Sequence, residues 1–536
     1  MPSEKFLKNL TEPSKWGERV YTTDDFNYPN EFNSAVELLK VGLGIDNGEK
    51  IAIHFGDQTY SYNQVEAESN RWGNFFKKLG VKPEDRVILR MLNNPDYVFM
   101  WLGLLKIGGV AVATMPLLRA KELSYIAEDS EARFVITSEN LLAEVENCKG
   151  KMPTVERICS IGNTGEFAFE DELNTCSTEL DFHLTKRDDV ALIGYTSGST
   201  GNSKGTVHFH EDVLVIADGY AKNILKPTPE DVFGGHPTLA FTFGLGALLV
   251  FPFRFGASTV LLEKFTPEVM LDLLQNYGVT ISFCAPTAYN AMMKLNAESP
   301  HNLSKLRIGV SAGETLPAVT FDSFKRVFGV ELLDGIGATE MLHIFITNYP
   351  GEAKPGSTGK VVPGYQAKVV NENFEQQPAG EPGVLLVKGP TGCRYWKKPE
   401  RQAGYVYDGW NTPGDIFSQD EEGYFYYHCR NDDLIISSGY NIAGPEVENS
   451  LLAHDAVKES GVIGKPDKNR GQIVKAYVVL NEGFSPSEEM VLELQEQVKN
   501  YLAPYKYPRE IEFVSELPRT ETGKVKRFIL RKKSTE

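Results

Sequence analysis

A stretch rich in glycine and hydroxyl residues, YTSGSTGNSKGTVH at residues 195–208, constrains this chain more than any other segment. It follows the apolar run 190–193 and precedes a segment with a helical pattern. Glycine lets backbone N–H groups turn toward one point, and the hydroxyls and the single lysine, Lys204, add further donors. The segment therefore predicts a strand, a loop and a helix that bind a polyanion such as a nucleoside triphosphate.

The spacing of this loop differs from that of the common P-loop, which requires glycine, four residues and then Gly-Lys-Ser/Thr. Here Ser203 precedes Lys204, and Gly205 follows it. A flexible polar loop is the alternative interpretation of an isolated Gly/Ser run. The apolar run before it, the helical pattern after it and the embedded lysine favour phosphate binding.

The length of 536 residues exceeds one ordinary domain, so at least two packing units are expected. The net charge of −17 argues against general nucleic-acid binding. No apolar run reaches the length of a membrane span, and the start of the chain lacks a basic region followed by an apolar core. We expect a cytoplasmic protein without nucleic-acid or membrane partners. The six cysteines form no Cys-x-x-Cys pair, which argues against a zinc site or a disulfide framework.

The pattern along the chain predicts an α/β fold in two domains. Residues 30–140 and 190–340 alternate β-rich runs with helical patterns, which is typical of parallel sheets covered by helices. From 355 to 430, short strands separated by glycine and proline indicate an antiparallel β subdomain. Beyond it lies a compact α+β pattern large enough for its own core. We place a large N-terminal domain at residues 1–430 and a small α+β C-terminal domain at residues 431–536.

Two further segments follow predicted strands, as the loop after residue 193 does. They are SAGE at 311–314 and DGIGATE at 334–340. Open α/β sheets bind ligands beyond the carboxyl ends of their strands, so we expect all three segments to meet. A carboxylate beside a triphosphate is explained by Mg²⁺, which prefers carboxylate and phosphate oxygens. The alternative for Glu340 is an acid that begins a helix.

The loop TSGSTGNSKG at 196–205 matches every fixed position of the phosphate loop of the acyl-adenylate-forming (AMP-binding) superfamily, Thr-Ser-Gly-Ser/Thr-Thr-Gly-x-x-Lys-Gly. The chain resembles this superfamily of acyl-CoA synthetases, luciferase and peptide-synthetase adenylation domains over nearly its whole length. Its other motifs follow in order as DGIGATE at 334–340, TPGD at 412–415, Arg430 and PRTETGKVKR at 518–527. The segments most similar to benzoate-CoA ligases, with 2-aminobenzoate-CoA ligases nearest, are 239–246, 334–343, 439–446 and 503–509.

The resemblance implies an AMP-forming acid–thiol ligase with a mobile C-terminal domain. ATP and coenzyme A are the implied substrates, with Mg²⁺ as cofactor and a small carboxylic acid as the third partner. An aromatic acid such as 2-aminobenzoate or benzoate is expected. A short- or medium-chain fatty acid, a stand-alone enzyme that loads a carrier protein, a luciferase-like oxidation and a non-catalytic nucleotide sensor remain alternatives. The sequence leaves a homodimer open.

The resemblance also implies roles for single residues. Lys524 and Lys204 are the expected catalytic residues, Glu340 the metal ligand, Asp432 the hinge and Gly439 the residue near CoA. The residues expected to bind ATP are Thr196, Ser197, Gly198, Ser199, Thr200, Gly201, Lys204, Gly313, Glu314, Asp334, Thr339, Glu340, Asp415, Arg430 and Lys524. The residues expected to line the acyl pocket are His236, Phe241, Phe243, Gly244, Gly335, Ile336, Gly337 and His343.

One motif departs from the superfamily's pattern. The element Thr-Gly-Asp, which holds the ribose hydroxyls in the superfamily, is interrupted here by Pro413. We therefore carry over Asp415 and leave Thr412 out.

Overall fold

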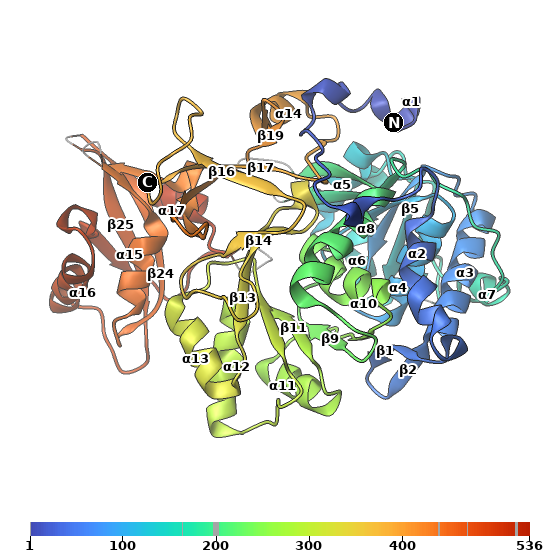
Figure 1. The fold of residues 1–536 in the computed structure, drawn as a ribbon, viewed down its shortest axis with the longest axis horizontal. Helices are drawn as coiled ribbons and strands as arrows, with labels where there is room; N and C mark the ends of the chain where they lie inside the picture. The colour runs from blue at the N-terminus through green and yellow to red at the C-terminus, as the bar shows by residue number, and fades with distance from the viewer. Residues whose placement is uncertain are drawn as a thin grey trace. The chain divides into compact units, whose positions relative to one another are not determined.

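The computed structural model describes residues 2–162, 164–196, 203–437, 440–468, 470–519 and 524–535, without the side chains of Asp432 and Asn441. The chain divides into two compact units (Figure 1). Unit 1 comprises Met1–Ala367 and Val387–Asn411, and unit 2 comprises Lys368–Leu386 and Thr412–Glu536. Within the described part of the chain, no helix has the length and apolar character needed to span a membrane.

The first sheet of unit 1 has six strands in the order β6-β5-β3-β4-β7-β8. All neighbours are parallel except β7 and β8, which pair antiparallel. The inner strands are buried runs of valine, isoleucine, leucine and alanine, as expected where helices cover a sheet. The strands are β3 (Arg86–Arg90), β4 (Val110–Ala113), β5 (Phe134–Ser138), β6 (Arg157–Ile161), β7 (Val190–Thr196) and β8 (Lys204–Phe209).

The second sheet of unit 1 has nine strands in the order β15-β14-β13-β12-β11-β9-β10-β1-β2. Its inner strands are parallel, and antiparallel pairs close both edges. The strands are β1 (Ile51–Phe55), β2 (Gln58–Ser61), β9 (Val232–Gly235), β10 (Ser258–Val260), β11 (Ile281–Cys284), β12 (Ile308–Ser311), β13 (Leu332–Gly337), β14 (Ile344–Thr347) and β15 (Lys360–Val361). The expected pattern of parallel sheets with helices is confirmed.

Local signals explain where the helices of unit 1 begin and end. Helix α11 begins at Pro267, where the Thr266 hydroxyl accepts a hydrogen bond from the Val269 amide at 3.1 Å. Helix α3 begins with a capping box of Ser61 and Gln64 and ends at Gly80, whose φ is 89°. Figure 1 shows α12 and α13 beside β13. The longer helices are α2 (Ser34–Gly44), α3 (Tyr62–Leu79), α4 (Pro95–Lys106), α5 (Ala120–Ser130), α11 (Pro267–Asn276), α12 (Pro286–Glu298) and α13 (Ala318–Phe328).

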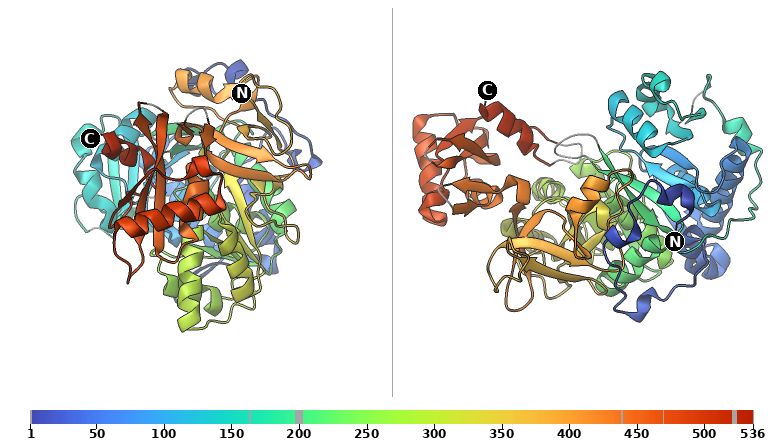
Figure 2. Two further views of the ribbon diagram at one scale, coloured as in Figure 1. Left: turned by 90° about the vertical axis from the view of Figure 1, so that its left-hand side faces the viewer. Right: turned by 90° about the horizontal axis from the view of Figure 1, so that it is seen from above.

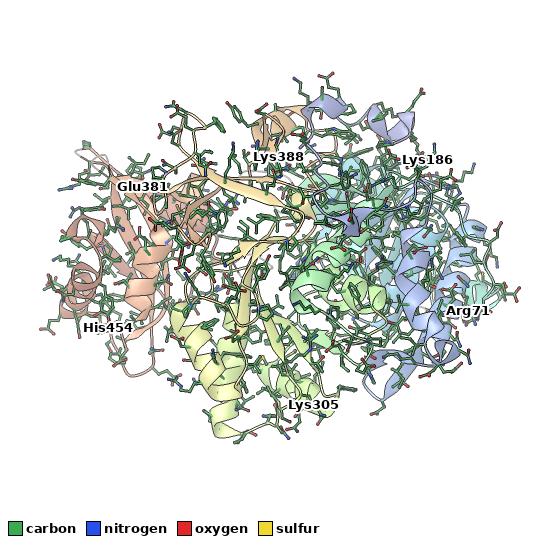
Figure 3. All side chains as sticks on the ribbon, in the orientation of Figure 1. Arg71, Lys186, Lys305, Glu381, Lys388 and His454 are labelled. Carbon is green, nitrogen blue, oxygen red and sulfur yellow. The ribbon has the colours of Figure 1, made fainter. Side chains whose placement is uncertain are left out.

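Short helices complete unit 1, and two of them continue into π-helical turns. These are η6 (Ala217–Leu225) after α8 and η7 (Gly246–Val250) between α9 and α10. The short helices are α1 (Glu4–Leu7), α6 (Leu142–Glu146), α7 (Glu170–Asn174), α8 (His210–Ile216), α9 (Thr242–Leu245), α10 (Phe251–Arg254) and α14 (Pro399–Tyr405). Strands β18 (Val406–Tyr407) and β19 (Trp410–Asn411) form a small antiparallel pair. Charged side chains such as Lys186 and Lys305 lie on the outside (Figure 3).

Unit 2 contains the expected antiparallel strands and a small α+β part. Strands β20 (Asp415–Gln419) and β21 (Phe425–Arg430) form a hairpin, and β17 (Gly383–Lys388) pairs with β20 and β16 (Gln366–Val370). The α+β part holds β22 (Ile435–Ser437), β23 (Tyr440–Ile442), β24 (Val457–Asp467), β25 (Gly471–Leu480), β26 (Glu510–Phe513), α15 (Gly444–Leu452), α16 (Glu488–Tyr501) and α17 (Arg527–Thr535).

Helices cover both faces of the sheet in the α+β part. Val474 and Val478 of β25 pack with residues of α15 and α16. Tyr477 and Val479, which point to the opposite face because side chains alternate along a strand, pack with Leu530 of α17. Figure 2 shows this sheet and its helices at the red end of the colour scale. This part of unit 2 therefore has a core of its own.

Candidate functional site

The predicted phosphate loop connects β7 to β8. Thr196 ends β7, Lys204 begins β8, and the two residues are directly paired across the strands. The expected ATP-binding residues Ser197, Gly198, Ser199, Thr200 and Gly201 lie outside the described residues. The threonine and the lysine that flank the loop in sequence therefore lie side by side at the end of the β7–β8 pair.

The helix expected after residues 195–208 is present as α8, but the sequence prediction missed a strand within that stretch. Strand β8 comes between the loop and α8, which begins only at His210. The segment Thr206 to Phe209 carries β-branched and aromatic side chains, which favour a strand when a partner strand is available. Partners lie on both sides, because β8 pairs with β7 and Val207 N donates to the Arg394 carbonyl at 2.9 Å.

The turn η8 (Thr339–Met341) follows β13 and carries the predicted metal ligand. A Cβ atom added to Gly194 of β7 would lie 2.9 Å from Thr339 Cγ2, so this strand and the turn are in close contact. The half-buried Glu340 accepts a hydrogen bond from the Tyr395 hydroxyl at its Oε1 atom, over 2.6 Å. The fold thus brings η8 against the strand that leads into the phosphate loop.

Strands β12 and β13 are parallel neighbours, but the segment that was expected to follow a strand begins inside β13. Ser311 at the end of β12 is the register partner of Asp334. Gly313 follows β12 with a φ of 90°, a conformation that glycine tolerates, and Glu314 is half-buried. Burial raises the pKa of the Asp334 carboxyl well above its usual range. A protonated Asp334 can donate a hydrogen bond.

Two of the expected acyl-pocket residues, Phe243 and His343, belong to a largely buried aromatic cluster. The His343 ring lies 5.9 Å from the Phe243 ring, measured between centroids. Burial lowers the pKa of His343 to about 3, so its imidazole is neutral at physiological pH. The sequence prediction missed three members of the cluster, because no local motif marks them. They are Phe251, Tyr220 and Phe283. Between ring centroids, His343 lies 4.6 Å from Phe251 and 5.5 Å from Tyr220, and Phe243 lies 5.6 Å from Phe283.

Glycines bring the backbone close to this cluster. A Cβ atom on Gly246 would lie 2.4 Å from His343 Cδ2, and one on Gly337 would lie 2.7 Å from the His343 carbonyl oxygen. Gly335 is similar, with a Cβ position 3.0 Å from Ile344 Cδ1. Side chains larger than hydrogen do not fit at Gly246 and Gly337. The backbone at Gly246 and Gly337 therefore packs directly against His343, where no side chain fits.

Two other expected pocket residues lie in different surroundings. The His236 ring packs at a tilt against Phe265, with 4.8 Å between ring centroids, and burial lowers the pKa of His236 to about 4. Phe241 lines a small cavity together with Trp101, Leu192, Gly194, Leu239 and Thr242. Gly244 packs on the backbone, since a Cβ atom there would lie 2.1 Å from the Thr238 carbonyl oxygen. Ile336 is half-buried on β13.

The predicted ribose-binding residues of unit 2 are paired with each other. Asp415 begins β20, Arg430 ends β21, and the two are register partners. Arg430 Nη1 donates to Asp415 Oδ1 at 3.0 Å and to the Pro413 carbonyl at 2.8 Å. A Cβ atom on Gly414, which has a φ of 82°, would lie 2.9 Å from Arg430 Nη2. The inserted Pro413 therefore supplies an acceptor that orients the arginine.

The remaining predicted residues of unit 2 are described only in part. Lys524 is exposed. Gly439 and the side chain of Asp432 lie outside the described residues.

The site fits Mg²⁺ bound together with a nucleotide better than a metal held by protein alone. Among the described residues, no group of three or more His, Cys, Asp and Glu side chains gathers as a metal cage. Mg²⁺ is usually held by one or two carboxylates together with phosphate oxygens and water. The half-buried carboxylate of Glu340 beside the phosphate-loop strand matches that donor set.

Comparison with known proteins identifies the family. The family model described as AMP-binding enzyme matches residues 46–396, and that of the AMP-binding enzyme C-terminal domain matches residues 446–524. The chain belongs to the AMP-binding enzyme family. It is an AMP-forming, ATP-dependent acid–CoA ligase. ATP, a carboxylic acid and CoA are the substrates that the family implies.

Similar proteins of this family include ligases for aromatic acids. Benzoate–CoA ligase of Thauera aromatica is 38% identical over 508 residues, covering 94% of this chain and 96% of the relative. The crystal structure of the anthranilate CoA ligase AuaEII in complex with anthranoyl-AMP superimposes with a TM-score of 0.90 at 35% identity, covering 96% and 99% of the two chains. A benzoate CoA ligase from Burkholderia xenovorans LB400 gives a TM-score of 0.84 at 35% identity, covering 93% and 100%.

Proposed function

We propose that this AMP-binding enzyme activates an aromatic carboxylic acid, such as 2-aminobenzoate or benzoate, and transfers the acyl group to CoA. The aromatic cluster around His343 carries this proposal. The half-buried Phe243 ring lies beside the neutral His343, and the buried Phe251 ring packs edge-on against that histidine. Flat apolar walls with few polar groups suit a planar ring, and aromatic pairs prefer this kind of stacking. The similarity to ligases named for benzoate and anthranilate supports the same substrate class.

In the first half-reaction, a carboxylate oxygen of the acid bonds to the α-phosphorus of ATP, and the bond to pyrophosphate breaks. Lys204 at the base of the phosphate loop and Lys524 lower the cost of the charge that builds up on the phosphates. Asp415 accepts hydrogen bonds from the ribose hydroxyls, and Arg430 orients it. Glu340 holds Mg²⁺, which when bound supplies further positive charge at the phosphates.

In the second half-reaction, the sulfur of CoA bonds to the acyl carbon, the bond to AMP breaks, and the thiol proton leaves to solvent. In our proposal, the C-terminal domain, residues 431–536, moves about Asp432 between the two steps. This movement brings Gly439 toward the acyl-adenylate. The mixed anhydride is the activated acyl donor, so the chemistry requires no enzymic nucleophile.

The test measures AMP formation with ATP, Mg²⁺ and CoA against benzoate, 2-aminobenzoate, phenylacetate and fatty acids of short to medium length. We expect the highest kcat/KM with benzoate or 2-aminobenzoate. A higher kcat/KM with a fatty acid would overturn the aromatic assignment. Acyl transfer to a carrier protein, with CoA inactive as the acceptor, would overturn the CoA step.

A pair of variants tests the pocket itself. Phe243→Leu removes a ring that faces His343, and we expect kcat/KM for the aromatic acid to fall roughly 2- to 10-fold, as for loss of one ring–ring contact. The matched control is Phe265→Leu, which removes the ring that packs against His236. Equal losses in both variants would contradict the placement of the acyl ring near Phe243.

A further inference from the structure

Three consecutive residues of the turn η8 are each held by a side chain from elsewhere in unit 1. The bonds join His208 Nε2 to the Thr339 carbonyl at 2.7 Å, the Tyr395 hydroxyl to Glu340 Oε1 at 2.6 Å, and the Thr391 hydroxyl to the Met341 carbonyl at 2.9 Å. Two bonds fix the backbone on either side of Glu340, and the third fixes its carboxylate. The turn is therefore restrained at every residue.

Two of these side chains come from the segment 391–396, which lies along β8. Val207 N donates to the Arg394 carbonyl at 2.9 Å, and Trp396 N donates to the Gly205 carbonyl at 2.8 Å. Thr206 and Tyr395 form an isolated antiparallel bridge between them. Because β8 begins at Lys204, this segment links the strand of the phosphate-loop lysine to the turn that carries Glu340.

The three side chains are shielded from water. His208 and Thr391 have no exposed surface, and Tyr395 is 4% exposed. The Tyr395 ring packs edge-on against Tyr405 at 5.6 Å, and the Tyr365 hydroxyl lies 2.8 Å from the Thr391 hydroxyl. Hydrogen bonds that exclude water are stronger than exposed ones, and packed rings hold their donors in place. These contacts therefore define one orientation for the Glu340 carboxylate.

The backbone next to the turn adopts a conformation that needs such restraint. Leu342 is fully buried and has a φ of 68° and a ψ of −34°, which is disfavoured for a residue other than glycine. Strained backbone persists only where the surrounding structure holds it, and it concentrates at functional sites. The bond from Thr391 to the carbonyl of Met341 acts on the residue directly before the strained one.

We propose that Tyr395 is a positioning residue that presents the Glu340 carboxylate to the metal of a bound metal–ATP complex in one orientation. The proposal rests on the proposed role of Glu340 as the metal ligand. A carboxylate held at one oxygen loses less freedom when it binds a metal, so its affinity is higher. Partners that orient a metal ligand typically contribute 10- to 100-fold to metal affinity.

The experiment measures Mn²⁺ binding to the enzyme–ATP complex by electron paramagnetic resonance, in the absence of acid so that no adenylate forms. We expect Tyr395→Phe to raise the Mn²⁺ dissociation constant by about 10-fold. The matched control is Tyr405→Phe, which removes a neighbouring phenol oxygen and leaves the Tyr395–Glu340 bond in place. We expect that control to bind Mn²⁺ like the wild type.

The variant Glu340→Gln distinguishes a failure of the positioning role of Tyr395 from a failure of the metal-ligand role of Glu340. If Glu340→Gln weakens Mn²⁺ binding and Tyr395→Phe does not, the positioning role of Tyr395 is overturned and the proposed metal ligand stands. If Glu340→Gln leaves Mn²⁺ binding unchanged, the metal-ligand role itself is overturned. The double variant should bind Mn²⁺ no more weakly than Glu340→Gln alone, and additive losses would show independent roles.

A second variant keeps the test valid if Tyr395→Phe does not fold. Thr391→Val removes the bond to the Met341 carbonyl with little change in side-chain volume. We expect it to weaken Mn²⁺ binding in the same direction and by a smaller factor. Unchanged Mn²⁺ binding in folded Thr391→Val protein would overturn the restraint of the turn.

Discussion

Asp212 of α8 connects two arginines within unit 1, and its replacement by asparagine should destabilise the protein strongly. The side chain has no exposed surface. It accepts hydrogen bonds from Arg394 Nη1 at 3.0 Å, from the Phe209 amide at 2.9 Å and from Arg19. Burial by itself would raise the pKa of Asp212, but the positive charges of Arg19 and Arg394 outweigh it and hold the pKa below its usual value. Asp212→Asn removes the charge and keeps the shape.

The expected loss of unfolding free energy in Asp212→Asn depends on which carboxylate partners Arg19 and Arg394 keep. Arg19 keeps Glu211, with Nη1 and Oε2 at 2.9 Å. Arg394, whose side chain is 1% exposed, keeps no carboxylate partner among the residues that the structure describes. Breaking a buried ion pair from one side costs about 3–5 kcal/mol, and we expect about 3 kcal/mol because only one guanidinium loses its partner. The exposed pair of Arg157 and Glu172, with side chains 42% and 39% exposed, provides the control. Glu172→Gln should cost under about 1 kcal/mol.

The assay is urea unfolding followed by tryptophan fluorescence. The Trp16 ring lies 5.6 Å from the Arg394 guanidinium carbon, so its emission reports on this region. At neutral pH, the first transition of Asp212→Asn should occur at lower urea than that of the wild type, and Glu172→Gln should resemble the wild type. Equal shifts in the two variants would refute the reasoning.

The difference in unfolding free energy between the wild type and Asp212→Asn should also depend on pH, which gives a second check. A carboxyl whose folded pKa is depressed stabilises the protein above its unfolded pKa and loses this contribution as pH falls through the folded value. The difference between wild type and Asp212→Asn should therefore be constant near neutral pH and shrink progressively below about pH 4. A difference that stays constant down to pH 3 would contradict the depressed pKa of Asp212.

Three further predictions concern the reaction and the buried histidine. Lys524→Ala should slow adenylate formation roughly 10²–10³-fold and leave thioester formation from supplied acyl-adenylate almost unchanged, and equal losses in the two assays would contradict the role of Lys524. Asp415→Asn should raise the KM for ATP about 10-fold and abolish discrimination against 2′-deoxy-ATP, whereas a variant that still discriminates would exclude ribose binding by Asp415. Because burial lowers the pKa of His343 to about 3, the unfolded chain takes up this proton near pH 6.5 and the folded one does not. His343→Phe should therefore reduce the loss of unfolding free energy on acidification from pH 6.5 to 4.5, by up to about 1.4 kcal/mol per pH unit in urea titrations.

Strand and helix patterns predicted the layers of the fold well where burial and local propensity agree. The alternation of β-rich and helical patterns predicted over residues 190–340 is present in the structure, for example as α11 followed by β11. Strand β8 was missed by the sequence analysis, because its conformation depends on two partners, β7 and the segment 391–396. Neither the glycine-rich sequence before β8 nor the helical pattern after it indicates that β8 pairs with both β7 and residues 391–396.

The sequence alone determined the chemistry of this protein. The phosphate loop, Glu340, Asp415 and Lys524 each lie in a short motif, and their proposed contacts with phosphate, metal and ribose require particular residue types at fixed spacing. Order along the chain then identified the family, which both family models confirm.

The tertiary structure alone decided what surrounds those motifs. Tyr395 reaches Glu340 across 55 positions of sequence, and Arg394 reaches Asp212 across 182. Such contacts have no spacing that a sequence pattern could reveal. They depend on which strands pair, and on the need for each buried charge or donor to find a partner once water is excluded.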